Sequence, residues 1–265
     1  MEREMRVPSH VDGLTLVELR DFAALIAEEA GELVESMRST RHRAEYKPDG
    51  SHVTEADRQA ELLLRRRIAD RFPMHEILGE EHGYKQSDSP FRWVLDPIDG
   101  TRSYVAGIPL YTVLVAVLYK GYPVVGIIHN PATHETAAGL DGQATLLNGV
   151  SIHVSETERL DEAMLCVTDP SNFIRRQGSG AVKLLRTVKQ CRTWADGYGY
   201  LLVASGRVDA MIDPIMNPWD IAALKPVIEG AGGRFTDIAG EVQGMGTSSV
   251  AAPPRLHAEL LDVLG

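Results

Sequence analysis

The sequence predicts a layered α+β protein. Segments with strand periodicity and segments with helical periodicity come in blocks along the 265 residues, without the strict strand–helix alternation that builds an all-parallel sheet. The composition, with 44% hydrophobic and 24% charged residues, is ordinary for a globular protein, and the length suffices to bury a substantial core. Since there is neither an internal repeat nor a low-complexity linker, we expect a single domain over residues 1–265.

Two helices are predicted near the N-terminus. Apolar residues recur at helical spacing over Leu14–Met37, and Thr15 with Glu18 forms a capping-box signature. Residues 47–51 have turn chemistry, and Thr54 is predicted to cap a second helix that ends near Phe72.

Buried strands follow these helices. The predicted strands are Glu76–Gly79, Phe91–Leu95, Thr112–Leu118 and Val124–His129, with shorter strand patterns up to Val154. The second strand ends abruptly at Asp96-Pro97. The last two lie in the most apolar stretch of the chain, which Lys120 and Gly121 interrupt, so we expect a hairpin and not a membrane span.

Helical patterns dominate the C-terminal part. The predicted helices are Ala181–Lys189, Gly197–Ser205, Trp219–Glu229 and Pro254–Leu264. Pro226 weakens the third helix, although the apolar spacing continues past it. Prolines at the start of the last helix occupy positions where they are tolerated.

Charge and cysteine content exclude several function classes. The net charge of −10 and the sequence pI near 5.4 give no electrostatic support for a nucleic-acid partner. Cys166 and Cys191 belong to no zinc pattern and are interpreted as reduced thiols. Residues 1–13 contain no apolar run typical of a signal peptide, so we expect a soluble, cytoplasmic protein with no membrane partner.

The most informative run is Trp93–Thr101. Asp96 and Asp99 lie where a hydrophobic strand stops, and such a turn can aim both carboxylates and the Ile98 carbonyl at one point. These hard oxygen ligands suit Mg²⁺ and do not suit Zn²⁺. Gly100 allows a substrate to approach the backbone, and a helical turn that opens at Thr101 would offer N–H groups to a phosphate.

Two further acidic features accompany this run. Glu80-Glu81 follows a predicted strand, and Asp220 lies in the first turn of an apolar helix. Taken singly, each acidic residue has a simpler interpretation, as a turn residue, a solvated strand end or a carboxylate that favours a helix N-terminus. Taken together, three acidic sites attached to hydrophobic elements indicate a shared metal-binding role.

These motifs resemble those of the inositol monophosphatase family of Mg²⁺-dependent, Li⁺-sensitive phosphatases. Residues 96–101 resemble the signature motif of this family. Two other motifs of the family match Gly79-Glu80-Glu81 and Trp219-Asp220, in the same order along the chain. Residues 53–57 resemble the helix-start motif of the family, so the resemblance covers nearly the whole chain. It implies an α/β/α/β/α sandwich of the inositol monophosphatase/fructose-1,6-bisphosphatase type, usually homodimeric, that forms no covalent phospho-enzyme.

The resemblance also implies residue roles. It assigns two or three Mg²⁺ ions to Glu80, Asp96, the Ile98 carbonyl, Asp99 and Asp220. Glu80 and Thr101 would position and activate the attacking water, with Asp57 supporting them through hydrogen bonds. Asp99, Gly100 and Thr101 would bind the phosphate. The N-terminal half, about 1–150, then supplies most ligands of the catalytic domain, and the C-terminal half, about 151–265, supplies Asp220.

The substrate is harder to predict. Residues 101–104 read Thr-Arg-Ser-Tyr, which resembles histidinol-phosphate phosphatases, whereas many inositol-type members have Asn in place of Ser103. Residues 194–198 match a second pattern of those enzymes only in part. Asp213 lies where inositol enzymes often have a substrate-binding Glu. Asp196 and Asp213 would complement the ammonium and imidazole of histidinol phosphate, although Asp196 could equally be a cap of the helix that starts near Gly197.

Three functional hypotheses follow. The first is hydrolysis of histidinol phosphate to histidinol, a step of histidine biosynthesis. The second is a broader inositol, sugar or nucleotide phosphatase of the same fold. The third is a regulatory or binding module with reduced catalysis, against which the intact metal motifs argue. In the first two, the partner is a small phosphate ester.

Overall fold

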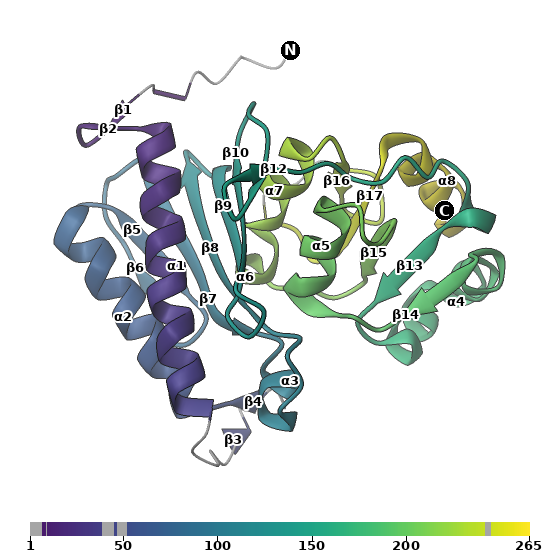
Figure 1. The fold of residues 1–265 in the computed structure, drawn as a ribbon, viewed down its shortest axis with the longest axis horizontal. Coiled ribbons are helices and arrows are strands. Elements are labelled where there is room, and N and C mark those ends of the chain that lie inside the picture. Colours follow the sequence, from purple (N-terminus) through teal and green to yellow (C-terminus); the bar gives the residue numbers. More distant parts are fainter. Residues whose placement is uncertain (1–6, 9, 39–44, 47–51, 242–244) are drawn as a thin grey trace.

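The protein folds into five layers, shown by a computed structural model that describes residues 7–8, 10–38, 45–46, 52–241 and 245–265. Helices α1 and α2 cover one face of a large sheet, and α5, α6 and α7 lie between this sheet and a smaller one (Figure 1). Helices α4 and α8 cover the outer face of the smaller sheet. The layers therefore confirm the layered α+β architecture and follow the α/β/α/β/α order that the resemblance implies.

The large sheet contains eight strands. Their order is β12 (Val150–Ser151), β11 (Leu146–Leu147), β10 (Glu135–Leu140), β9 (Tyr122–Asn130), β8 (Thr112–Tyr119), β7 (Phe91–Asp99), β5 (Glu76–Gly79) and β6 (Gly83–Lys85). Neighbours pair antiparallel except β5 and β7, which are parallel. The carboxyl ends of β5 and β7 therefore meet at one edge of the sheet.

The small sheet contains five strands. Their order is β14 (Gln190–Arg192), β13 (Met164–Val167), β15 (Ala210–Asp213), β17 (Ser249–Ala252) and β16 (Arg234–Thr236). Two short hairpins lie outside both sheets, namely β1 (His10–Val11) with β2 (Leu14–Thr15) and β3 (Glu45–Tyr46) with β4 (His52–Val53). A 3₁₀ turn, η1, spans Leu160–Glu162.

The N-terminal helices begin at the caps that the sequence predicts. Helix α1 spans Leu16–Arg38, and Thr15 and Glu18 exchange hydrogen bonds ahead of it. Helix α2 spans Glu55–Arg71, with Thr54 as its N-cap. The predicted turn at residues 47–51 lies outside the described residues. A short helix, α3, spans Thr101–Ala106.

The later helices correct two predictions. Helix α4 (Pro170–Thr187) begins eleven residues before the predicted Ala181, with a kink at Gly178 (φ 55°) that hides its periodicity. The single helix predicted over Trp219–Glu229 is wrong, because α6 (Pro218–Ile221) and α7 (Leu224–Gly230) are separate. Pro226 thus lies in the first turn of α7, where no N–H donor is needed.

Two other elements match their predictions closely. Helix α5 spans Asp196–Ala204 and α8 spans Pro254–Leu264. The predicted end of a strand at Leu95 needs correction, because β7 continues to Asp99 past a shift in register between Asp96 and Asp99.

Three hydrophobic clusters hold the layers together. The first fills the space between α1, α2 and the large sheet around Trp93, which is fully buried. The second lies between the sheets around Tyr200, and the third lies beneath α4 and α8 around Phe173. Fully burying a large apolar side chain contributes about 1.5–3 kcal/mol, so these clusters fix the sheets relative to each other.

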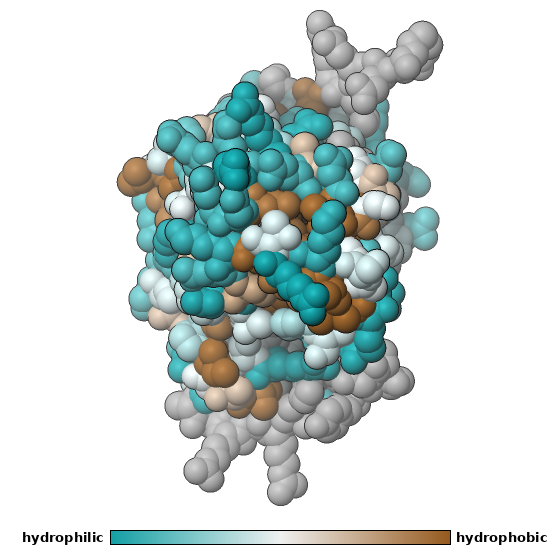
Figure 2. Space-filling model, turned by 90° about the vertical axis from the view of Figure 1, so that its right-hand side faces the viewer, coloured by the Kyte–Doolittle hydropathy of each residue, from teal (hydrophilic) through white to brown (hydrophobic). Residues whose placement is uncertain are grey.

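The side of the molecule beyond the small sheet is mainly hydrophilic, with separate small hydrophobic areas (Figure 2). Within the described part of the chain, no helix combines the length and apolarity needed to cross a bilayer.

Candidate active site

The candidate site lies at the irregular end of β7. The β7–β8 ladder pairs Asp96 with Leu114 and Asp99 with Thr112, and its register shifts between these pairs. Pro97 lies in the shifted segment, where its missing N–H removes no ladder hydrogen bond. The Ile98 N–H donates to Asp96 Oδ1 over 3.1 Å, which orients this carboxylate within the turn.

Three carboxylates converge here, two from β7 and one from α6. One oxygen each of Asp96, Asp99 and Asp220 lies within 4.8 Å of the others. Asp96 is buried, whereas Asp99 and Asp220 are partly exposed. Asp220 occupies the third position of α6, and its Oδ2 accepts from the Asn217 N–H over 2.7 Å. The helix cap therefore holds Asp220 in place.

Asp57 occupies the same position in α2. Its Oδ2 accepts from the N–H of Thr54 over 2.8 Å and from the Thr54 hydroxyl. Its Oδ1 lies 3.3 Å from Thr101 Oγ1, which also lies 3.0 Å from the Ile98 carbonyl oxygen. The Thr101 hydroxyl thus lies within hydrogen-bonding distance of two acceptors beside the acidic cluster, and its single hydrogen can be donated to one of them at a time.

Glu80 approaches the cluster from the end of β5. Its N–H donates to the Leu95 carbonyl over 3.2 Å, so Glu80 extends the parallel pairing of β5 with β7. Burial is the main cause that raises the pKa of Asp57, Asp96 and Asp220, and the charge of Glu80 raises the pKa of all three further. Glu80 therefore lies within electrostatic reach of all three.

The carboxylates perturb one another strongly. Burial and the neighbouring acids raise the pKa of Asp96 and Asp99 well above the usual range. Burial, opposed by cap hydrogen bonds, raises the pKa of Asp57 and of Asp220 to about 6. So many acids cannot all be ionised at close range unless a cation offsets their repulsion. Since the donors are all hard oxygens, the residues fit a divalent cation of the Mg²⁺ type.

Helix α3 follows this turn directly. Gly100, its N-cap, adopts φ +88°, and a Cβ there would lie 2.8 Å from the Leu110 carbonyl oxygen. Only glycine fits that conformation and space. The N–H groups of the first turn, from Thr101 onward, have no acceptor within the helix, so they are suited to an anion.

Asp196 faces the site from the start of α5. It has a left-handed backbone (φ 55°), which is strained for a residue other than glycine. Burial and then Asp213 raise its pKa to about 7. The N-cap of α5 is Ala195, and no side chain caps the helix, so the interpretation of Asp196 as a cap is wrong.

Asp213 lies deeper, at the end of β15. It is buried, its Oδ2 accepts from the Tyr200 hydroxyl over 2.9 Å, and its Oδ1 accepts from the Thr168 N–H over 3.3 Å. Burial raises its pKa. Both oxygens of Asp213 thus have protein donors, in contrast to the more accessible Asp196.

Two adjacent hollows border these acids. The larger has a volume of about 540 Å³ and extends from Glu80 and Gly100 to Thr193. The smaller, about 90 Å³, lies among Asp99, Asp213 and Asp220. Both are lined by Thr168, Asp169 and Asp196.

Sequence reasoning missed Thr168 and Asp169, which belong to both hollows. Asp169 caps α4 by accepting from the Asn172 N–H over 3.0 Å. An aspartate before Pro170 is a helix-start signal that could have identified this border. Thr168 gives no such signal, although its Oγ1 accepts from the Asp196 N–H.

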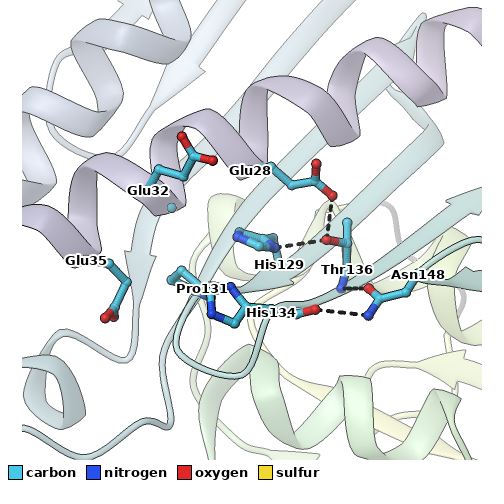
Figure 3. Close-up of a pocket in the computed structure, with 9 residues that line it drawn as sticks. Glu28, Glu32, Glu35, His129, Pro131, His134, Thr136 and Asn148 are labelled. Atoms are coloured by element: carbon cyan, nitrogen blue, oxygen red, sulfur yellow. Dashed lines mark hydrogen bonds between the residues drawn. The ribbon is translucent and has the colours of Figure 1, made fainter.

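A separate pocket of about 530 Å³ lies between α1 and the β9–β10 hairpin (Figure 3). Thr136 Oγ1 donates to Glu28 Oε1 over 2.8 Å and therefore accepts from His129 Nδ1 over 3.0 Å. Burial lowers the pKa of His129 to about 4, so its ring is neutral. None of the predicted site residues lines this pocket.

Known proteins share both this sequence pattern and this fold. Residues 15–264 match the inositol monophosphatase family. A chloroplastic bifunctional phosphatase of Arabidopsis thaliana is 39% identical over 86% of this chain and 67% of its own. A histidinol-phosphatase of Chlorobaculum parvum is 36% identical over 92% of this chain and 95% of its own. The solved IMPase structure of Thermotoga maritima superposes with a TM-score of 0.85 at 28% identity, covering 93% of this chain and 96% of the other.

These matches confirm the predicted family and fold. The family match spans nearly every element from α1 to α8. The chain therefore belongs to the inositol monophosphatase family of phosphatases.

Proposed function

We propose that this protein is a Mg²⁺-dependent phosphomonoesterase whose preferred substrate is histidinol phosphate. The observation that carries the metal-dependent part is the convergence of Asp96, Asp99 and Asp220 within 4.8 Å. With Glu80 and the Ile98 carbonyl, these residues would bind two or three Mg²⁺ ions. Bound Mg²⁺ neutralises phosphate charge and lowers the pKa of water, which phosphoryl transfer requires.

The residues of the chain would orient the reactants. The Thr101 hydroxyl has one hydrogen and two lone pairs. When it donates to Asp57 or to the Ile98 carbonyl, its lone pairs remain available to accept from the attacking water. Glu80 lines the same hollow as Thr101 and would be the base that contacts this water. The Gly100 and Thr101 amides, beside Asp99, would hold the phosphate oxygens in line.

Asp196 supports the choice of substrate. Its carboxylate borders both hollows, and it is more accessible than Asp213. The substrate ammonium would donate to Asp196, while buried Asp213 would add negative potential behind it. The Thr-Arg-Ser-Tyr sequence at residues 101–104 and the 36% identical histidinol-phosphatase favour the same assignment.

A broader polyol or sugar phosphatase is the second candidate. The hollows also carry uncharged polar side chains, namely Thr168, Asn172 and Thr193, which suit substrate hydroxyls. The IMPase neighbour with TM-score 0.85 favours this alternative.

A substrate panel tests the proposal. Phosphate release would be measured with Mg²⁺ on histidinol phosphate, inositol 1-phosphate, fructose 1,6-bisphosphate and glycerol phosphate. We expect kcat/KM to be at least about 10-fold higher for histidinol phosphate, since one charge-assisted contact contributes about 1.5–3 kcal/mol. Equal values on all four esters would favour the broader phosphatase. No turnover of any ester would overturn the assignment to a phosphatase.

A further inference from the structure

An ion pair on α2, between a fully buried Glu61 and a partly exposed Arg65, holds the turn that carries Glu80. Glu61 has no exposed surface, although charged side chains are seldom fully buried unless they are paired. Its Oε2 accepts from the Glu81 N–H over 2.6 Å, and its Oε1 accepts from the His82 N–H over 3.1 Å. These are the two amides that directly follow Glu80.

Arg65, one helical turn later on α2, also contacts this turn. Its Nε donates to Glu61 Oε1 over 2.6 Å, which neutralises the buried carboxylate. Its Nη2 donates to the Gly83 carbonyl at the far end of the same turn. The pair therefore holds the segment from Glu81 to Gly83 against the side of α2.

Gly79 explains how the carboxylate comes so close. A Cβ at Gly79 would lie 2.1 Å from Glu61 Oε1 and 2.8 Å from Oε2. The Glu61 carboxylate thus fills the space that any other residue would need at position 79. On its opposite side the turn is fixed by the hydrogen bond from the Glu80 N–H to the Leu95 carbonyl.

We infer that Glu61 is a positioning residue, which fixes the Gly79–His82 turn so that Glu80 is presented to the cation site. The inference rests on the proposed function, because the metal-binding role of Glu80 is itself a proposal. The charge of Glu80 reaches Asp57, Asp96 and Asp220, so a small rotation of the turn would alter the whole cluster. A purely structural Glu61 would stabilise the fold without affecting cation affinity.

The first experiment is Glu61→Gln, which keeps the shape but replaces one acceptor oxygen with a donor. We expect amide exchange at Glu81 and His82 to accelerate at least about 10-fold in the metal-free protein. We also expect Mg²⁺ affinity, measured by calorimetry, to fall about 10- to 100-fold, as is usual when a residue that orients a ligand is changed. At saturating Mg²⁺, kcat should largely recover.

The matched control is Glu76→Gln. Glu76 lies on β5, the strand that ends at Gly79. It is buried, and it pairs with Arg92 Nε over 2.8 Å. Its loss should change stability but leave Mg²⁺ affinity and the exchange of the Glu81 amide as in the original protein.

A second pair of substitutions tests the inference even if Glu61→Gln does not fold. Gly79→Ala alone should weaken Mg²⁺ binding, because its methyl group displaces the Glu61 carboxylate. Adding Glu61→Asp shortens that side chain and should restore part of the affinity, so the two changes should be non-additive. Additive losses would overturn the inference.

The remaining outcomes separate the two proposals. Unchanged Mg²⁺ affinity in Glu61→Gln, whatever its stability, would overturn the positioning role. Failure of the original protein to bind Mg²⁺ would overturn the proposed function. In that case, an unchanged rate of amide exchange at Glu81 and His82 in Glu61→Gln would still contradict the proposal that Glu61 holds the turn in place.

Discussion

The Gly197 N–H donates to Asp99 Oδ2 and so joins the start of α5 to the end of β7, 98 residues earlier in the chain. A Cβ at Gly197 would lie 2.7 Å from this oxygen and 2.3 Å from Thr112 Oγ1. The close approach of α5 to Asp99 therefore requires glycine at this position.

Gly197→Ala tests this relationship. Because its methyl group would push Asp99 out of the cluster, we expect kcat to fall at least about 10-fold and stability to fall by about 1–3 kcal/mol. Steady-state kinetics and thermal unfolding would measure both. The control is Gly180→Ala in α4, where the added carbon meets its nearest neighbour at 3.1 Å, far from the acids. Full activity in Gly197→Ala would contradict this account.

Asp99→Asn separates catalysis from folding. The amide oxygen can still accept from Gly197, but the charge is lost, so we expect activity to fall by roughly 10²- to 10⁴-fold. Because burial and then like charges raise the pKa of Asp99, removing its charge relieves both the cost of burial and the repulsion. The melting temperature in chelator should therefore be equal or higher. A large drop in that temperature would show that the carboxylate serves the fold.

Removal of metal should abolish turnover. Chelation should stop phosphate release and added Mg²⁺ should restore it, because the clustered acids repel a phosphate unless a cation offsets them. Mg²⁺ at about 100 times its Kd should raise the free energy of unfolding by about 2.7 kcal/mol. Undiminished activity in excess chelator would eliminate the proposed mechanism.

Asp196→Asn tests substrate recognition. If Asp196 accepts the substrate ammonium, kcat/KM for histidinol phosphate should fall roughly 10- to 150-fold, the equivalent of about 1.5–3 kcal/mol. Glycerol phosphate has no ammonium, so its hydrolysis should hardly change. Equal losses on both substrates would instead point to damage of the shared phosphate site.

The lowered pKa of His129 predicts how the free energy of unfolding changes in acid. Burial, with His134 nearby, holds its folded pKa at about 4, below the value of about 6.5 in an unfolded chain. The unfolded chain therefore binds an extra proton between these values. His129 should thus lower stability as the pH falls from about 6.5 to about 4, by up to about 3 kcal/mol.

Denaturant unfolding across this pH range provides the measurement. In His129→Gln the loss on acidification should be smaller than in the original protein, and His257, whose pKa burial also lowers to about 4, should account for part of the remainder. The comparison variant, His134→Gln, removes an exposed residue of the same pocket that adds less than burial to the lowering of the His129 pKa, so the profile should change only slightly. Parallel profiles for His129→Gln and the original protein would refute the prediction.

Local signals made much of the fold predictable. Thr54 identified the start of α2, and Pro254 identified the start of α8, because caps and prolines act within one helical turn. The kink at Gly178 and the break between α6 and α7 were missed. Both carry a local signal that competes with the apolar periodicity, since glycine permits the positive φ of the kink and Pro226 disfavours a helix that continues through it.

The acids of the site were found because they form compact motifs. The contact of Asp99 with Gly197 was not predictable, because it arises only in the folded chain. The hydrogen bond between Thr101 and Asp57 was expected from the family resemblance alone, and not from the spacing of the residues. Glu61 gave no signal at all, since a single glutamate on a charged helix is indistinguishable from a solvated one in sequence.

The capping role of Asp220 has a consequence for biosynthesis. Asp220 enters the acidic cluster from α6, which leaves the ribosome long after Asp57, Glu80, Asp96 and Asp99. A nascent chain that has completed the large sheet therefore still lacks the carboxylate that closes the site. Cation binding by ribosome-bound intermediates of increasing length should therefore appear only once α6 has emerged.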